Sequence, residues 1–115
     1  MDEQTILARF REFSALTGEA LTDCRTLCRD AARELRERYQ DEEAGTELFC
    51  SASAALAYYR YCLAAYSGSA LSRLGEAALV NEKTLAAAKA LSEEYLSALA
   101  PFLRSARFQF KQVKP

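Results

Sequence analysis

The first forty residues alternate between hydrophobic and polar positions with the period of an α-helix. From about Glu3 to Leu16, apolar side chains fall at steps of three and four, which predicts a helix with one apolar face. Gly18 follows it and is placed for a left-handed cap. A second amphipathic stretch begins at Glu19 or Thr22 and runs to about Gln40. We therefore expect two helices before the first polar break.

The segment from Thr46 to Ser67 is the most apolar part of the chain. Thr46 is a good N-cap, and from Glu47 to Tyr66 the only other charged residue besides Glu47 is Arg60. Leucines, aromatic residues and alanines occupy every side of this helix, so every side needs cover. We predict that it is the central helix of the fold, and that its cover is incomplete at the tyrosine-rich edge.

The second half of the chain contains one more long helix. Asn81 is placed to cap it, helical spacing continues to about Leu103, and Pro101 bends or ends its last turn. Segment 74–80 ends in two β-prone residues, and 108–113 begins with strand-like alternation, so we expect a short two-stranded β element between them. The predicted fold is a single, mainly α domain with four helices around an apolar central helix.

Composition and charge add little to this picture. The chain of 115 residues is half hydrophobic and 27% charged, as is usual for one folded domain. A net charge of −1 provides no overall attraction to nucleic acid or membranes. Residues 1–45 carry a net charge of −4 and residues 46–115 a net charge of +3. The last twelve residues contain four basic side chains and no acidic one. A solvated basic tail is the plainer interpretation, and contact between oppositely charged ends of neighbouring copies is the alternative.

The cysteines and the first residues both bear on the compartment. The chain begins with Met1-Asp2-Glu3 and shows no signal peptide, and its most apolar stretch is a poor membrane span, which predicts a cytoplasmic protein. Four cysteines fit that compartment as free thiols in the core. They form two pairs within apolar helical faces, Cys24 with Cys28 and Cys50 with Cys62. A Cys₄ zinc site is the alternative.

The inventory of reactive residues favours binding or assembly over catalysis. The chain has no histidine, the commonest general base, and a cysteine nucleophile would therefore lack its usual partner. Its four scattered glycines make no phosphate-binding loop. The adjacent Glu93 and Glu94 point in different directions on a helix. We therefore predict no catalytic residue, cofactor, metal or small-molecule substrate.

The second predicted helix separates its charges by sign. Arginines cluster on one flank and acids on another, as follows: Arg25, Arg29, Arg33 and Arg36, against Asp23, Asp30, Glu34 and Glu37. Most such patterns are solvated surfaces whose charges pair with one another. A ridge of arginines beside an apolar face also suits a subunit interface or a phosphate contact.

Three runs along the chain resemble a known family. They are Phe-Ser-Ala-Leu-Thr-Gly at 13–18, Leu-Cys-Arg-Asp-Ala-Ala at 27–32 and Ala-Ala-Leu-Ala-Tyr-Tyr-Arg-Tyr at 54–61. In their order and amino-acid composition, these runs resemble the small helical head–tail connector (head-completion) proteins of tailed phages and prophages. The expected order of helices and short extended pieces is similar as well. The chain departs from that family at residues 74–78, where a Gly-Asp-Val-like strand is the family pattern.

The resemblance implies a structural adaptor without catalysis, which assembles into a ring beneath the portal and joins the capsid to the tail. Its partners are then further copies of itself and the portal and tail proteins, in the host cytoplasm and the virion. The interface residues that we expect are Arg25, Arg29, Arg33, Arg36, Tyr58, Tyr59, Arg60, Tyr61, Arg107 and Lys111. Two alternatives are a stand-alone bacterial interaction module that dimerises through the tyrosine-rich central helix, and a small enzyme or metal-binding bundle that uses cysteines and carboxylates.

Overall fold

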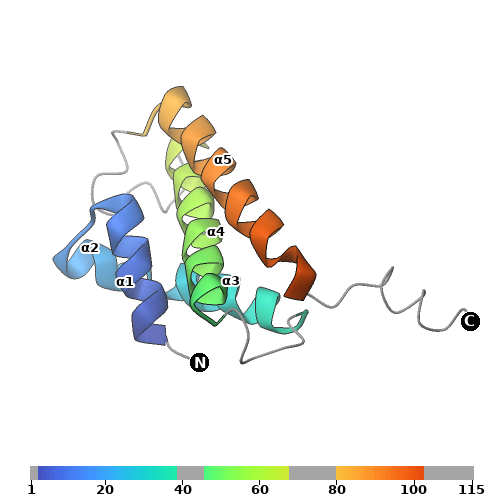
Figure 1. The fold of residues 1–115 in the computed structure, drawn as a ribbon. Coiled ribbons are helices and arrows are strands. Elements are labelled where there is room, and N and C mark those ends of the chain that lie inside the picture. Colours follow the sequence, from blue (N-terminus) through green and yellow to red (C-terminus); the bar gives the residue numbers. More distant parts are fainter. Residues whose placement is uncertain (1–2, 39–45, 68–79, 103–115) are drawn as a thin grey trace, which may run out of the picture.

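The computed structural model describes residues 3–38, 46–67 and 80–102, and this part of the chain is mainly helical, as predicted (Figure 1). The elements in order are α1 (Glu3–Ser14), α2 (Gly18–Asp23), α3 (Arg25–Arg36), α4 (Thr46–Ser67), α5 (Glu82–Leu99) and the 3₁₀ turn η3 (Ala100–Phe102). The expected β element, 74–80 with 108–113, lies outside the described residues except for Val80, which is not in a strand. No helix among the described residues has both the length and the apolarity that a membrane crossing requires.

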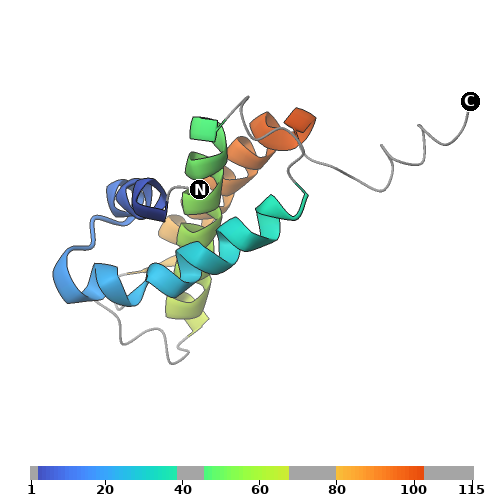
Figure 2. The same ribbon diagram turned by 90° about the horizontal axis from the view of Figure 1, so that it is seen from below.

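Helix α4 is the centre of the fold, and its observed bounds are the predicted ones. α1, α3 and α5 each pack on it, and α1 also packs on α3 (Figures 1 and 2). The seven consecutive residues 51–57 are all buried, and all except Leu56 are alanine or serine. Such small side chains let the surrounding helices approach α4 closely. Phe49, Tyr61 and Cys62 extend the core toward both ends of the helix.

The ends of α5 follow the predicted signals. Asn81 caps the helix, because its Oδ1 accepts a hydrogen bond from the Thr84 N–H at 2.9 Å. At the other end the α-helix stops at Leu99, and the 3₁₀ turn that follows contains Pro101. Proline has no N–H and its ring clashes with the preceding turn, so this residue is a sufficient cause for the change.

The prediction of one continuous second helix is wrong. The chain forms α2 and α3, with a break at Cys24, whose φ of −89° and ψ of 3° lie outside the helical region. The Cys24 N–H bonds the Leu21 carbonyl at 3.0 Å, a tightened 3₁₀-type turn. No glycine or proline marks this site, and the Cys24 side chain is completely buried. The low helix propensity of Thr22, Asp23 and Cys24 and the packing of the Cys24 side chain in the core both favour the break.

Helix α1 ends at Ser14, two residues before the predicted end. The residue after it is Ala15, which has a left-handed φ of 64°, and its N–H bonds the Arg11 carbonyl at 2.7 Å. Gly18 also has a left-handed φ, of 62°, but it begins α2 and does not cap α1. The early end brings Leu16 into the core, where only 3% of it is exposed.

Candidate interaction surface

The cover of α4 is incomplete on one face near its C-terminal end. Leu63 is 40% exposed and Tyr66 is 47% exposed. Among the described residues, they are the two large hydrophobic side chains that are most open to solvent. They continue a row that begins with Leu56, which is 9% exposed, and half-buried Tyr59. These four residues follow one another at steps of three, four and three, so they share one face of the helix. We name Leu56, Tyr59, Leu63 and Tyr66 the α4 stripe.

Polar contacts mark the two edges of the α4 stripe. On one side, the Arg60 guanidinium donates to the Glu34 carboxylate of α3 at 2.7 Å. On the other, the Tyr66 hydroxyl lies 3.5 Å from the Glu82 carboxylate at the start of α5. The stripe therefore lies between α3 and α5, which flank α4 there.

The predicted interface tyrosines do not form one surface. Tyr61 is buried, and its ring meets Phe10 of α1 edge-on with the ring centroids 6.2 Å apart. Tyr58 is half-buried on the same side, 6.4 Å from Phe10 and 6.3 Å from Phe13 between ring centroids. Both face α1, whereas Tyr59 belongs to the α4 stripe. Burial raises the pKa of Tyr58 to about 12, and the neighbouring Cys62 side chain adds to the rise.

The arginines of α3 are exposed, and two of them pair within the chain. Arg29 donates to Glu3 of α1 at 2.7 Å, and Arg33 donates to Asp30 one turn earlier at 2.8 Å. Arg25 and Arg36 are exposed and form no ion pair with any described residue. The predicted Arg107 and Lys111 lie outside the described residues. The Arg29–Glu3 contact joins α3 to α1, so this arginine of the ridge helps to hold the fold together.

The four cysteines are free and buried, as predicted. Burial raises the pKa of the Cys24 thiol to about 11 and that of Cys28 to about 12, and it also raises the pKa of Cys62. Thiols in this state are poor nucleophiles and poor metal ligands, because both roles require the thiolate. Among the described residues, no three side chains of His, Cys, Asp or Glu are placed to hold a metal ion together.

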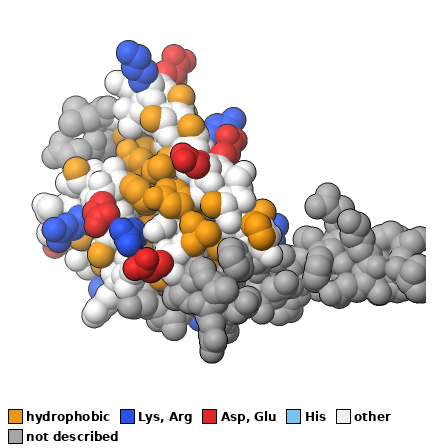
Figure 3. All heavy atoms as spheres, viewed as in Figure 1, with side chains coloured by type: hydrophobic (Ala, Val, Ile, Leu, Met, Phe, Trp, Pro, Cys, Tyr) orange, Lys and Arg blue, Asp and Glu red, His pale blue; other side chains and the backbone are white. Residues whose placement is uncertain are grey.

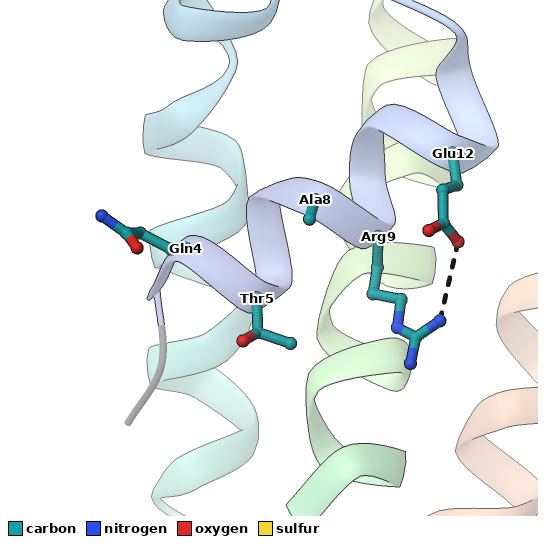
Figure 4. Close-up of a pocket in the computed structure, with 5 residues that line it drawn as sticks. All are labelled: Gln4, Thr5, Ala8, Arg9 and Glu12. Carbon is teal, nitrogen blue, oxygen red and sulfur yellow. Dashed lines mark ion pairs between the residues drawn. The ribbon is translucent and has the colours of Figure 1, made fainter.

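The hollows of the described surface are shallow. One, of about 390 Å³, lies along the outer side of α1, and one helix supplies all of its lining: Gln4, Thr5, Ala8, Arg9 and Glu12 (Figure 4). Arg9 and Glu12 pair across it at 3.6 Å. A second hollow, of about 280 Å³, lies where α1, α4 and α5 meet, beside Ala15 and Tyr58.

A second apolar area is visible on the face that Figure 3 shows. In Figure 3, hydrophobic side chains gather in the middle of the face between α1 and α5. Between the same two helices, the rings of Phe13 and Tyr95 lie with their centroids 5.9 Å apart. Because these aromatic side chains already pack on one another, this area is an extension of the core. The α4 stripe has no such bridge among the described residues.

Sequence reasoning missed Leu63 and Tyr66 as candidate contact residues. Their spacing after Leu56 and Tyr59 was visible in the sequence, but a helix that is apolar on every side does not show which row stays uncovered. That depends on where α3 and α5 cross it.

Comparisons with protein-family models, with curated proteins and with solved structures find no match to this chain.

Proposed function

We propose that this chain is a structural adaptor without catalysis, and that it acts by binding other protein chains. The observation that carries this proposal is the α4 stripe, where Leu63 and Tyr66 of the central helix lie open to solvent. Large apolar side chains in a row on an otherwise well-packed helix are typical of a surface that another protein covers. The tyrosine adds a polar hydroxyl, which suits a contact that is exposed at times.

The specific role that we propose is that of a head–tail connector of a tailed phage or prophage, in a ring beneath the portal. The resemblance of residues 13–18, 27–32 and 54–61 supports it, together with the arginines on the outer side of α3. In such a ring each copy presents one surface to the next, so the contacting surfaces differ from each other. The exposed arginines of α3 then face acidic groups of the neighbouring copy.

Charge reversal tests this role. The double variant Arg29→Glu, Arg33→Glu should abolish ring formation with the portal protein encoded in the same genome, as seen by electron microscopy. Its monomer should stay folded, because each lost ion pair is exposed and contributes only about 0.2–1 kcal/mol. Arg9→Glu is the matched control, since it removes a comparable exposed pair with Glu12 and should leave the ring intact. Normal ring assembly by the double variant, or a locus without portal, capsid and tail genes, contradicts the connector role.

The second candidate function is a stand-alone bacterial interaction module that dimerises through α4. The position of the exposed residues favours it, because Leu63 and Tyr66 lie on the central helix itself. The mass of the free chain in solution separates the two functions. A two-fold dimer through α4 supports the module, and a monomer that forms rings only with the portal supports the connector.

A further inference from the structure

We propose that the α4 stripe packs against the same stripe of a second copy of this chain, as an antiparallel pair of helices related by a two-fold axis. This inference rests on the second function proposed above, and it adds the contact residues and their register.

The spacing of the α4 stripe is the first reason. Steps of three, four and three are those of the a and d positions of a heptad, which pack knobs into holes against a second helix of the same period. In an antiparallel pair, a positions lie opposite d positions. Leu63 of one copy then faces Tyr59 of the other, and Tyr66 lies at each end of the contact, over the nearly covered Leu56. The exposed leucine of each copy therefore meets a tyrosine of the other copy.

The charges at the edges are the second reason. A two-fold antiparallel pair brings the α3 edges of both copies together. That edge carries both signs, because Arg60 and Glu34 form an ion pair there, so the two Arg60 side chains, which lie near the two-fold axis, are each neutralised by a Glu34 carboxylate. Glu82 lies at the end of the stripe beside Tyr66, and the antiparallel arrangement places the two copies of Glu82 at opposite ends. The helix dipoles are also opposed, which is favourable.

The size of the exposed area sets the strength of the contact. Less than half of Leu63 and of Tyr66 is exposed, and Leu56 is nearly covered. The patch is therefore much smaller than the roughly 800 Å² per partner of a standard interface. We expect a weak, reversible dimer, not a permanent one.

Sedimentation equilibrium over a range of concentrations tests the contact. The wild-type chain should show a monomer–dimer equilibrium, and Leu63→Glu should weaken it. Loss of one contact residue of this kind weakens binding by about tenfold. The two-fold axis repeats the change in the second copy, so the dissociation constant should rise by about a hundredfold. Ala8→Glu is the matched control. It adds the same charge to an exposed alanine on the outer side of α1 and should leave the equilibrium unchanged (Figure 4).

Disulfide formation tests the register. The natural thiols are buried, so a single introduced cysteine is the reactive one. A mixture of Tyr59→Cys and Leu63→Cys chains should form the mixed disulfide faster than either forms a disulfide with itself. A parallel pair would instead favour the two self-disulfides, and that result overturns the antiparallel register.

The outcomes separate the inference from the function on which it rests. If Leu63→Glu leaves the dimer intact, the chain is still a dimerising module, but the α4 stripe is refuted as its contact. A monomer at every concentration refutes both. In that monomer, a slowly reacting Leu63→Cys thiol would show that another segment of the same chain covers the stripe. A larger ring of the free chain also overturns the two-fold pair.

Discussion

Ser53 lies in the middle of α4 with its side chain completely buried, and its Oγ has no hydrogen-bond partner among the described residues. A buried hydroxyl without a partner costs roughly 1–3 kcal/mol relative to a solvated one. Ser53→Ala removes that oxygen alone, so it leaves little empty space. Alanine is also the better helix former, by roughly 0.5 kcal/mol. The substitution should therefore stabilise the fold.

The two contributions together predict a gain of about 1.5–3.5 kcal/mol in the free energy of unfolding. For a chain of this length, each kcal/mol raises the Tm by about 4 °C. Urea denaturation followed by far-UV circular dichroism measures the gain, and the m-value should stay unchanged because the surface exposed on unfolding is the same.

Ser97→Ala is the control, because Ser97 is an exposed serine within α5 and gains only the helix propensity. Ser53→Ala must exceed it by the cost of the buried hydroxyl. An equal gain in the two variants, or a loss of stability in Ser53→Ala, would refute the conclusion that this hydroxyl is buried without a partner.

Three further predictions concern stability in urea. Phe10→Ala should cost about 3–5 kcal/mol, because the ring is completely buried against two tyrosines of α4; a cost below about 1 kcal/mol would contradict that packing. Ala15→Gly should raise the free energy of unfolding by about 0.5–1 kcal/mol, because glycine adopts the left-handed conformation of residue 15 without strain. Ala8→Gly within α1 should lower it by about 1 kcal/mol. A change of the same sign in both variants would contradict the left-handed conformation of Ala15. Burial raises the pKa of Cys24 to about 11 and that of Cys28 to about 12, from the usual 9.0. The contribution of these two neutral thiols to the free energy of unfolding is therefore complete below pH 9 and is lost as the pH rises toward 11–12. The urea midpoint should fall over that range, and a flat profile would exclude buried thiols.

The elements that the sequence predicts best are those whose signals are local. α4 has its predicted bounds because Thr46 begins it and no other segment is apolar on all sides. α5 begins after Asn81, whose side chain caps it. The break at Cys24 had only a weak local signal, because Thr22, Asp23 and Cys24 are among the poorer helix formers, and its position also depends on packing with the rest of the core. The left-handed Ala15 was also unpredictable, because alanine rarely adopts that conformation.

The candidate surface depends on contacts that are distant in sequence. Arg29 pairs with Glu3, and Arg60 pairs with Glu34, each across 26 positions. A helical wheel shows that the arginines share a flank, but not which of them find partners on another helix. In the same way, Tyr61 and Tyr66 are alike in sequence context, and only the positions of α1 and α5 make one a core residue and the other a surface residue.

The most direct test of the central claim, that α4 is buried except along the α4 stripe, is hydroxyl-radical footprinting of the full chain. In dilute solution, Leu63 and Tyr66 should both be oxidised, and Tyr66 many times faster than Tyr61, which is 3% exposed. In concentrated solution, the same two residues should become protected while Tyr61 stays unchanged. Equal oxidation of Tyr61 and Tyr66 in dilute solution would contradict the arrangement of helices around α4.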